Sequence, residues 1–160
     1  VANISEDDLP QGGQYYAQLQ EVCRAQEVPC LAICAEVEAM LADLDESEKA
    51  EFMADFGLEE SALGRLINLC YRKLGLQTFF TAGSDECRAW TTKVGAKAPE
   101  AAGEIHSDLQ RGFIRAEVID YPSFMECGSL AVAKEKGLLR VEGKDYVVQD
   151  GDILNIRFNV

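Results

Sequence analysis

The sequence predicts an α+β protein in which a β-grasp (ubiquitin-like) domain follows a mostly helical region. From Gln77 onward the expected elements run β-β-α-β, then a short helix and further strands, which is the order of a β-grasp fold. Before that point, helical patterns surround one short apolar run, as in part of an α/β domain. Charge divides at the same place: residues 1–76 carry 15 acidic and 5 basic side chains, whereas residues 77–160 carry 13 and 10.

The overall composition excludes several classes of protein. With 48% hydrophobic and 27% charged residues, the 160-residue chain is globular rather than disordered. A net charge of −13 argues against DNA and against anionic membranes as partners. No apolar run approaches the roughly 20 residues of a membrane helix, and no signal peptide is evident. We expect a cytoplasmic protein, and the start at Val1 suggests a cut within a longer chain.

Neither the cysteines nor the histidine predict a metal site. The six cysteines contain no C-x-x-C pair and match no zinc or iron–sulfur spacing, so we expect reduced thiols. His106 is the only histidine, and we interpret it as a packed or capping residue rather than a catalyst.

The first region predicts helices around one strand. A helix is expected over Tyr15–Ala25, and the continuous apolar run Val28–Ala35 suits a strand buried on both faces, although no partner strand is visible. Asp45-x-x-Glu48 predicts a capping box opening a helix that Gly57 ends. The next helix ends at Gly75 and has an apolar face made of Leu63, Leu66, Ile67, Cys70, Tyr71 and Leu74.

Acidic side chains crowd the stretch from Glu36 to Glu60. We interpret them as a solvated helix face, with a site for a basic partner as the alternative.

The second region predicts the β-grasp elements in order. Gln77–Ala82 and Cys87–Thr92 flank Gly83-Ser84-Asp85 as a hairpin. The remaining predictions are a helix over Ala98–Leu109 that stops near Gly112, a strand over Phe113–Tyr121, a short helix over Ser129–Lys136, and strands over Leu139–Glu142, Tyr146–Val148 and Asp152–Phe158.

Three long segments of the sequence carry a family resemblance. GLEESALGRLINLCYRKLGLQTFFTAG, RAWTTKVGAKAPEAAGEIHSDLQRGFIRAEVI and EGKDYVVQDGDILNIRFNV closely resemble the C-terminal part of YchF-type Obg-like ATPases, P-loop NTPases of the TRAFAC class. In that family a P-loop domain with an inserted coiled coil precedes a TGS domain. The resemblance implies that residues 1–76 are the last part of the P-loop domain and that residues 77–160 are the TGS domain.

The opening residues match a base-recognition motif of that family. Asn3-Ile4-Ser5-Glu6 resembles its N-x-x-E, which replaces the N-K-x-D of guanine-specific GTPases. An Asp carboxylate in N-K-x-D accepts hydrogen bonds from guanine N1–H and the exocyclic amine, and adenine lacks both donors. Asn3 can still bond N7 and an exocyclic amine, and we expect Ile4 to contact the base. The resemblance therefore implies a preference for ATP over GTP.

A second loop is implied after the buried strand. Cys34, Ala35 and Glu36 resemble the second base-recognition loop, with backbone amides near Cys34 and Ala35 facing the base at the carboxyl edge of the sheet.

The phosphate-binding part of the family pattern is missing from the sequence. No G-x-x-x-x-G-K-[ST] occurs, and that loop holds the phosphates and Mg²⁺ in P-loop NTPases. ATP or GTP with Mg is implied for the intact family protein, whereas this chain alone is expected to hold no nucleotide tightly and to be inactive, with no catalytic residue of its own.

The resemblance also implies contact with the ribosome or its RNA. A basic face with one aromatic ring could bind phosphate and stack a base, and its candidates are Arg88, Trp90, Lys93, Lys97, Arg111 and Arg115. The alternative is that Trp90 fills the core and the lysines are merely solvated.

Two functional hypotheses follow. The first is the C-terminal part of an Obg-like ATP/GTP-binding NTPase that acts with the ribosome or the translation machinery. The second is a free-standing TGS module that binds RNA or the ribosome and has no nucleotide role.

Overall fold

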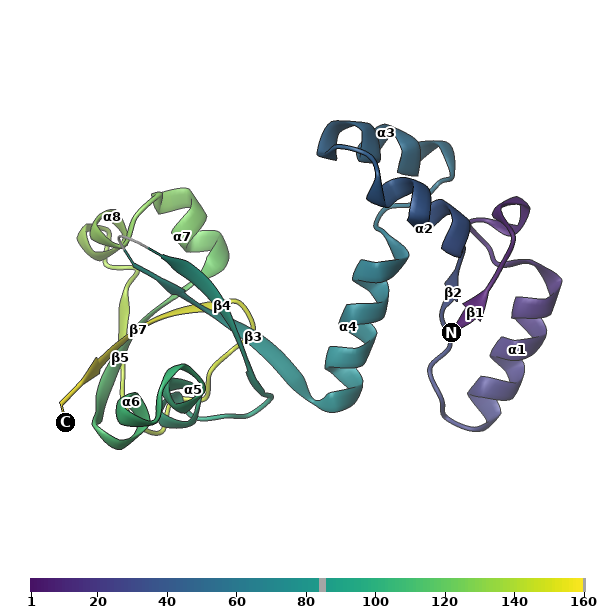
Figure 1. Ribbon diagram of the computed structural model, residues 1–160. Helices are drawn as coiled ribbons and strands as arrows, with labels where there is room; N and C mark the ends of the chain where they lie inside the picture. Colours follow the sequence, from purple (N-terminus) through teal and green to yellow (C-terminus); the bar gives the residue numbers. More distant parts are fainter. Residues whose placement is uncertain (84–85, 160) are drawn as a thin grey trace. The chain divides into compact units, whose positions relative to one another are not determined.

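The structure is a computed structural model that describes residues 1–83 and 86–159. It divides into two compact units, residues 1–70 (unit 1) and residues 71 onward (unit 2). The division falls within helix α4 (Ala62–Leu74), a few residues before the boundary predicted from the sequence. Both units combine helices and strands (Figure 1), and the predicted α+β class is confirmed.

Unit 1 contains a short parallel sheet of two strands. Strand β1 (Ala2–Asn3) pairs with β2 (Ala32–Ile33), with Ala2 opposite Ala32 and Asn3 opposite Ile33. The expectation that the apolar run Val28–Ala35 lacks a partner strand is therefore wrong. The strand is also shorter than predicted, because Pro29 has no N–H to donate and Ala35 already begins the next helix.

Four α-helices and one 3₁₀ helix surround this sheet. They are η1 (Glu6–Asp8), α1 (Gly13–Ala25), α2 (Ala35–Ala42), α3 (Glu46–Asp55) and α4. The predicted capping box is confirmed: the Asp45 carboxylate accepts from the Ser47 and Glu48 N–H groups, and Glu48 accepts from the Asp45 N–H.

The apolar residues of α4 form a helix as predicted, but part of its face stays uncovered. Leu63 and Ile67 are 61% and 49% exposed. The core of unit 1 lies elsewhere, around Cys34, Val37 and Leu41. Unit 1 thus leaves a large share of the α4 face in solvent.

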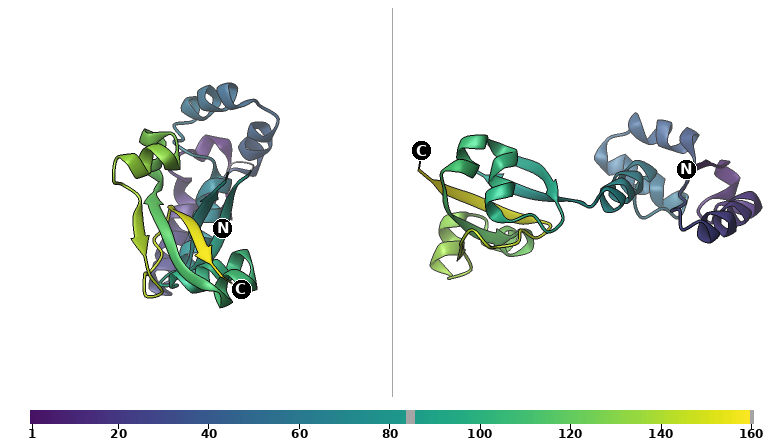
Figure 2. Two further views of the ribbon diagram at one scale, coloured as in Figure 1. Left: turned by 90° about the vertical axis from the view of Figure 1, so that its left-hand side faces the viewer. Right: turned by 90° about the horizontal axis from the view of Figure 1, so that it is seen from below.

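Unit 2 contains a mixed sheet of five strands in the order β4-β3-β7-β5-β6 (Figures 1 and 2). The strands are β3 (Leu76–Ala82), β4 (Cys87–Lys93), β5 (Phe113–Asp120), β6 (Arg140–Glu142) and β7 (Asp152–Phe158). Strands β3 and β7 are parallel, and the other pairs are antiparallel. The predicted hairpin is present, although Ser84 and Asp85 of its turn lie outside the described residues.

Helices pack on both faces of this sheet. Helices α5 (Ala98–Ile105) and α6 (Ser107–Arg111) lie over the core that contains Phe79, Ala116 and Leu154. On the opposite face, α7 (Tyr121–Cys127) and α8 (Leu130–Glu135) pack with Ile119 and Ile153.

Two predicted elements of unit 2 need correction, and one element is additional. The helix over Ala98–Leu109 breaks at His106, whose backbone is extended and whose Nδ1 accepts from the Asp108 N–H (3.2 Å), so the capping role of His106 is confirmed. Tyr146–Val148 does not form a strand: among the residues that the structure describes, it makes one isolated bridge, from Val147 to Lys97. Helix α7 was not predicted; Asp120 caps it through Ser123.

Among the described residues, no helix combines the length and the hydropathy that crossing a bilayer requires.

Candidate functional site

The two predicted base-recognition loops lie side by side at one edge of the unit 1 sheet. Asn3 is the last residue of β1. Ala35 is the first residue of α2 and is separated from the end of β2 by Cys34 alone. Because β1 and β2 are parallel, their carboxyl ends meet at the same edge. The Ala35 N–H donates to Asn3 Oδ1 at 3.0 Å and so joins the two loops directly.

This hydrogen bond limits what Asn3 and Ala35 can offer a base. The Ala35 N–H, which the resemblance assigns to the base, is already used by Asn3. Within the described part of the chain, the Asn3 Nδ2 amide makes no hydrogen bond, and the residue is exposed. The outward polar group of Asn3 is therefore a donor, which suits an acceptor such as a purine N7.

Other residues of the two loops fall into a buried group and an exposed group. Cys34 is 4% exposed and belongs to the core cluster, against which Ile4 also packs. The Ile4 N–H donates to the Ile33 carbonyl at 2.8 Å, which extends the pairing of β1 and β2. Glu6, in η1, and Glu36, in the first turn of α2, are exposed. A ligand at this edge would meet the two carboxylates and the Asn3 amide.

Sequence analysis did not identify Arg65 as part of this region. Its guanidinium on α4 donates to the Ala32 carbonyl of β2 at 2.7 Å, and its Nε is buried without a partner among the described residues. The helical period placed Arg65 off the apolar face of α4, and nothing in the pattern indicated that it would reach the sheet.

In unit 2, Trp90 has one of its predicted partners. The Arg88 guanidinium lies 4.2 Å from the centre of the Trp90 ring, a cation–π distance. The ring also packs against the core, and its Nε1–H donates to Thr81 Oγ1 at 3.0 Å. The structure therefore supports the alternative of a packed Trp90, with Arg88 resting on its ring.

The other candidate cations of unit 2 do not gather around Trp90. Lys97 pairs with Asp145 and Arg111 with Asp108, at 2.7 and 2.6 Å. The Asp145 carboxylate raises the pKa of Lys97, and Lys97 in turn lowers the pKa of Asp145.

Strand alternation places Lys93 and Arg115 on the opposite face of the sheet from Trp90. Trp90 pairs with Phe79 on the face covered by α5, and Lys93 lies three residues farther along β4. Arg115 lies opposite Arg157, which shares a face with Ile153. The four predicted residues that lie on strands thus occupy two faces of the sheet, whereas Lys97 and Arg111 lie at α5 and in α6. Their contact with RNA stays a prediction.

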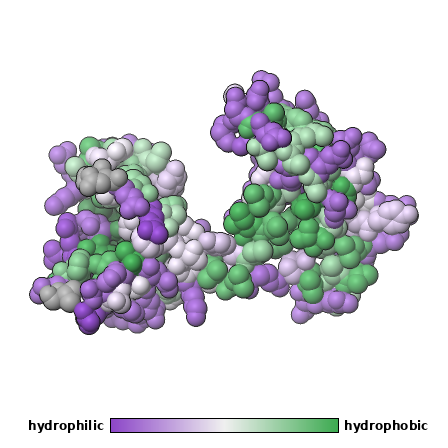
Figure 3. Space-filling model, in the orientation of Figure 1, coloured by the Kyte–Doolittle hydropathy of each residue, from purple (hydrophilic) through white to green (hydrophobic). Residues whose placement is uncertain are grey.

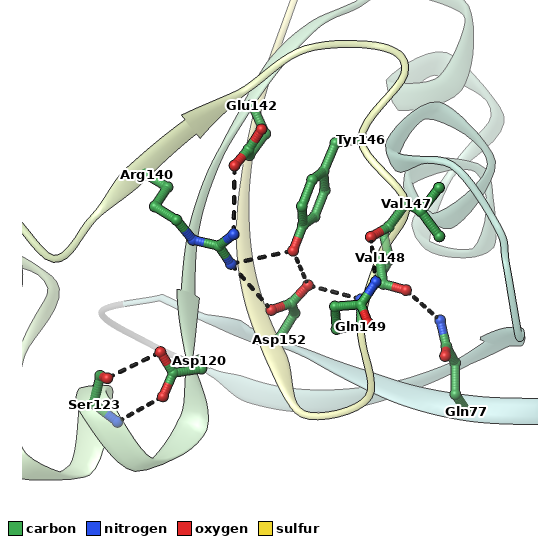
Figure 4. A network of polar contacts seen from close by, with 10 residues as sticks. All are labelled: Gln77, Asp120, Ser123, Arg140, Glu142, Tyr146, Val147, Val148, Gln149 and Asp152. Atoms are coloured by element: carbon green, nitrogen blue, oxygen red, sulfur yellow. Dashed lines mark hydrogen bonds and ion pairs between the residues drawn. The ribbon is translucent and has the colours of Figure 1, made fainter.

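A buried polar network stabilises unit 2, and sequence analysis missed it (Figure 4). Asp152 is 2% exposed, and its Oδ2 accepts from the Tyr146 hydroxyl at 2.6 Å and from the Gln149 N–H at 2.9 Å. Arg140 donates to the Tyr146 oxygen at 3.1 Å and lies 3.6 Å from Asp152 Oδ1. Burial and the bond to Asp152 raise the pKa of Tyr146 to about 12. Gln77 fixes the same loop by donating to the Val148 carbonyl at 2.7 Å.

No group of three or more His, Cys, Asp or Glu side chains suited to a metal ion occurs in the part of the chain that the structure describes. All six cysteines lie in that part, and each carries a free thiol.

Comparisons with known proteins find relatives that are longer than this chain. A family model named YchF-GTPase_C, described as a protein of unknown function, matches residues 76–159. The chain is 49% identical over 162 residues to a ribosome-binding ATPase YchF of Bacillus subtilis, covering 100% of this chain and 44% of that protein. It is 40% identical over 162 residues to an Obg-like ATPase 1 of Gallus gallus, covering 99% and 41%.

A solved structure resembles the whole fold. The structure of the Schizosaccharomyces pombe YchF GTPase matches with a TM-score of 0.84 and 30% identity, over 98% of this chain and 42% of that one. The chain therefore spans less than half the length of the relatives that it matches.

Proposed function

Because this chain belongs to the YchF family of Obg-like ATPases, as its C-terminal part, we propose that it supplies two functions of such a protein. Unit 1 is the last part of the P-loop nucleotide-binding domain and recognises the base of the nucleotide. Unit 2 is a TGS domain with a β-grasp fold and contacts the ribosome. The setting is the cytoplasm, where relatives named as ribosome-binding ATPases would meet their partner.

The observation that carries the nucleotide role is the hydrogen bond from the Ala35 N–H to Asn3 Oδ1. It joins two segments that are 32 residues apart and orients the Asn3 amide so that its Nδ2 donates outward. Adenine and guanine both offer N7, so this contact holds either purine. Selectivity for ATP comes from Glu6 in place of Asp, because the longer side chain does not match the two donors of guanine.

The exposed face of α4 supports the assignment of unit 1 to a larger domain. Ile67 remains about half in solvent within unit 1, although it lies on the helix's apolar stripe. Additional elements of a P-loop domain would cover such a face. The phosphates of the nucleotide and its Mg²⁺ would be held by those elements, since the sequence of this chain contains no phosphate-binding motif.

The strand order supports the β-grasp assignment of unit 2. The first and last strands, β3 and β7, are parallel neighbours at the centre, with β4 and the β5–β6 pair outside them. A helix pair, α5 and α6, crosses one face between the second and third strands. The first elements follow the order β-β-α-β predicted from the sequence, and Arg88 lies exposed on the edge strand β4.

The test of the nucleotide role joins this chain to a phosphate site. In a chimaera, residues 1–160 replace the matching C-terminal part of the Bacillus subtilis relative. Asn3→Ala removes the N7 donor and the link to Ala35, so we expect roughly a tenfold weaker affinity for ATP. Gln18→Ala, on an exposed position of α1, serves as a control and should leave affinity unchanged. Unchanged ATP affinity in the Asn3→Ala chimaera would refute the role of this loop.

A second experiment tests the ribosome contact of unit 2. The 160-residue chain is sedimented with ribosomes with and without ATP. Binding that is independent of ATP supports a ribosome contact in unit 2, and Arg88→Glu should weaken it. If the Asn3→Ala change also leaves nucleotide binding intact in the chimaera, the free-standing TGS module becomes the better description.

A further inference from the structure

An apolar groove with an acidic rim lies on unit 1, outside the proposed base site. Helices α2 and α3 and the start of α4 enclose about 600 Å³. The apolar lining includes Leu41, Met53 and Leu63, and the rim carries the carboxylates of Glu46, Glu59 and Glu60. In Figure 3 the surface over α3 is mainly hydrophilic, with hydrophobic atoms exposed between the hydrophilic side chains.

The walls of this groove are held in place by hydrogen bonds and packing. The Glu38 carboxylate on α2 accepts from the Ala62 and Leu63 N–H groups, at 2.7 and 3.3 Å, and so fixes the first turn of α4. Helix α3 packs Phe52 and Met53 against the core of unit 1. A ligand would therefore meet a largely preformed surface.

The groove surface combines apolar contact with strong negative charge. Leu63 is 61% exposed, whereas Leu41 forms a buried floor at 5%. Between Glu36 and Glu60 the sequence has ten Asp and Glu side chains and one Lys. That lysine, Lys49, pairs with Glu46 at 2.7 Å, whereas Glu59 and Glu60 make no ion pair among the described residues.

We propose that this groove binds a basic amphipathic helix of a partner protein, whose apolar side chains contact Leu63 and Met53 and whose Lys or Arg side chains meet Glu59 and Glu60. An apolar stripe in a groove is a common mode of helix recognition. The surplus of carboxylates selects cationic flanks and repels the phosphates of RNA. This surface is separate from the base site and from the unit 2 contacts, so the inference does not depend on either.

Peptide binding to the whole 160-residue chain tests this directly. The probe is a fluorescein-labelled peptide of about 14 residues, roughly four helical turns, with Leu at i, i+3, i+4 and i+7 and Lys or Arg elsewhere. Fluorescence anisotropy measures its affinity. A peptide of the same composition, scrambled so that the leucines no longer share a face, should bind at least about tenfold more weakly.

Two matched pairs of variants locate the contact. Leu63→Ala should weaken binding about tenfold because Leu63 loses its buried contact with the peptide. Ile67→Ala changes an exposed apolar position one turn along α4 and outside the groove, and it should not weaken binding of the peptide. The double change Glu59→Gln with Glu60→Gln should weaken binding roughly fivefold at low salt. Glu51→Gln with Asp55→Asn removes the same charge from α3 outside the groove and should have a smaller effect.

Several outcomes would overturn the proposal. Equal binding of the scrambled peptide, or equal losses from the two charge variants, would indicate general attraction to an acidic surface. An absence of saturable binding up to about 1 mM would exclude the groove as a docking site. Tighter binding of a single-stranded RNA, weakened by Leu63→Ala, would assign the groove to nucleic acid instead.

Discussion

Replacing Tyr146 with Phe tests the polar network that fixes the 146–149 loop in unit 2. The change removes the 2.6 Å hydrogen bond to Asp152, a carboxylate that is only 2% exposed, and the oxygen that accepts from Arg140 at 3.1 Å. It keeps the ring that packs against the core. A hydrogen bond to a charged group contributes about 1.5–3 kcal/mol. Because the ring is kept and Asp152 still accepts from the Gln149 N–H, we expect a loss of about 2 kcal/mol in the free energy of unfolding.

Urea unfolding followed by Trp90 fluorescence measures this loss. Trp90 is the only tryptophan and packs against the same core as Tyr146, so its signal reports unit 2. Thermal unfolding should shift by roughly 8–16 °C for a unit of this size. Tyr121→Phe is the matched control, because the Tyr121 hydroxyl makes no hydrogen bond among the described residues, and it should change stability by less than about 0.5 kcal/mol. A Tyr146→Phe effect as small as the control's would refute the account of this network.

Two further predictions concern Tyr146 in unit 2 and Glu38 in unit 1. The folded state raises the pKa of Tyr146 to about 12 from the ordinary value of 10.0. The neutral hydroxyl therefore stabilises unit 2 fully below pH 10, and this contribution is lost as the pH rises from 10 toward 12. In urea unfolding at alkaline pH, the Tyr146→Phe variant should not show this loss of stability. Glu38→Ala removes the acceptor for the Ala62 and Leu63 N–H groups and should destabilise unit 1 by about 1–2 kcal/mol. Amide hydrogen exchange in the first turn of α4 should become faster, whereas Glu51→Ala should leave that exchange unchanged.

Local patterns predicted most elements of the fold. The Asp45–Glu48 capping box and the β3–β4 hairpin depend on residues close in sequence, and both are present. Strand β1 could not be predicted in this way, because a strand of two residues is too short to show a hydrophobic alternation. Its pairing with β2 also spans about thirty residues of chain. The break at His106 also escaped the pattern, because the apolar spacing continues through it to Leu109.

The candidate sites were predicted less completely than the fold. The resemblance identified both loops at the edge of the unit 1 sheet, but only the structure shows that Asn3 Oδ1 is occupied by the Ala35 N–H. In unit 2 the sequence suggested a basic face, yet Lys97 and Arg111 each have an acidic partner, one of them distant in sequence. The Asp152 network joins three segments of the chain, and no single stretch of sequence reveals it.

The central claim is that the loop from Asn3 to Glu6 selects adenine over guanine. The most direct test measures the dissociation constants of ATP and GTP for the chimaera that carries this chain, side by side with a Glu6→Asp variant. The account predicts tighter binding of ATP by the parent chimaera and a shift of the ratio toward GTP in Glu6→Asp, because the shorter carboxylate can accept from guanine N1–H and its amine. Equal affinities for the two nucleotides, or a ratio unaffected by Glu6→Asp, would contradict it.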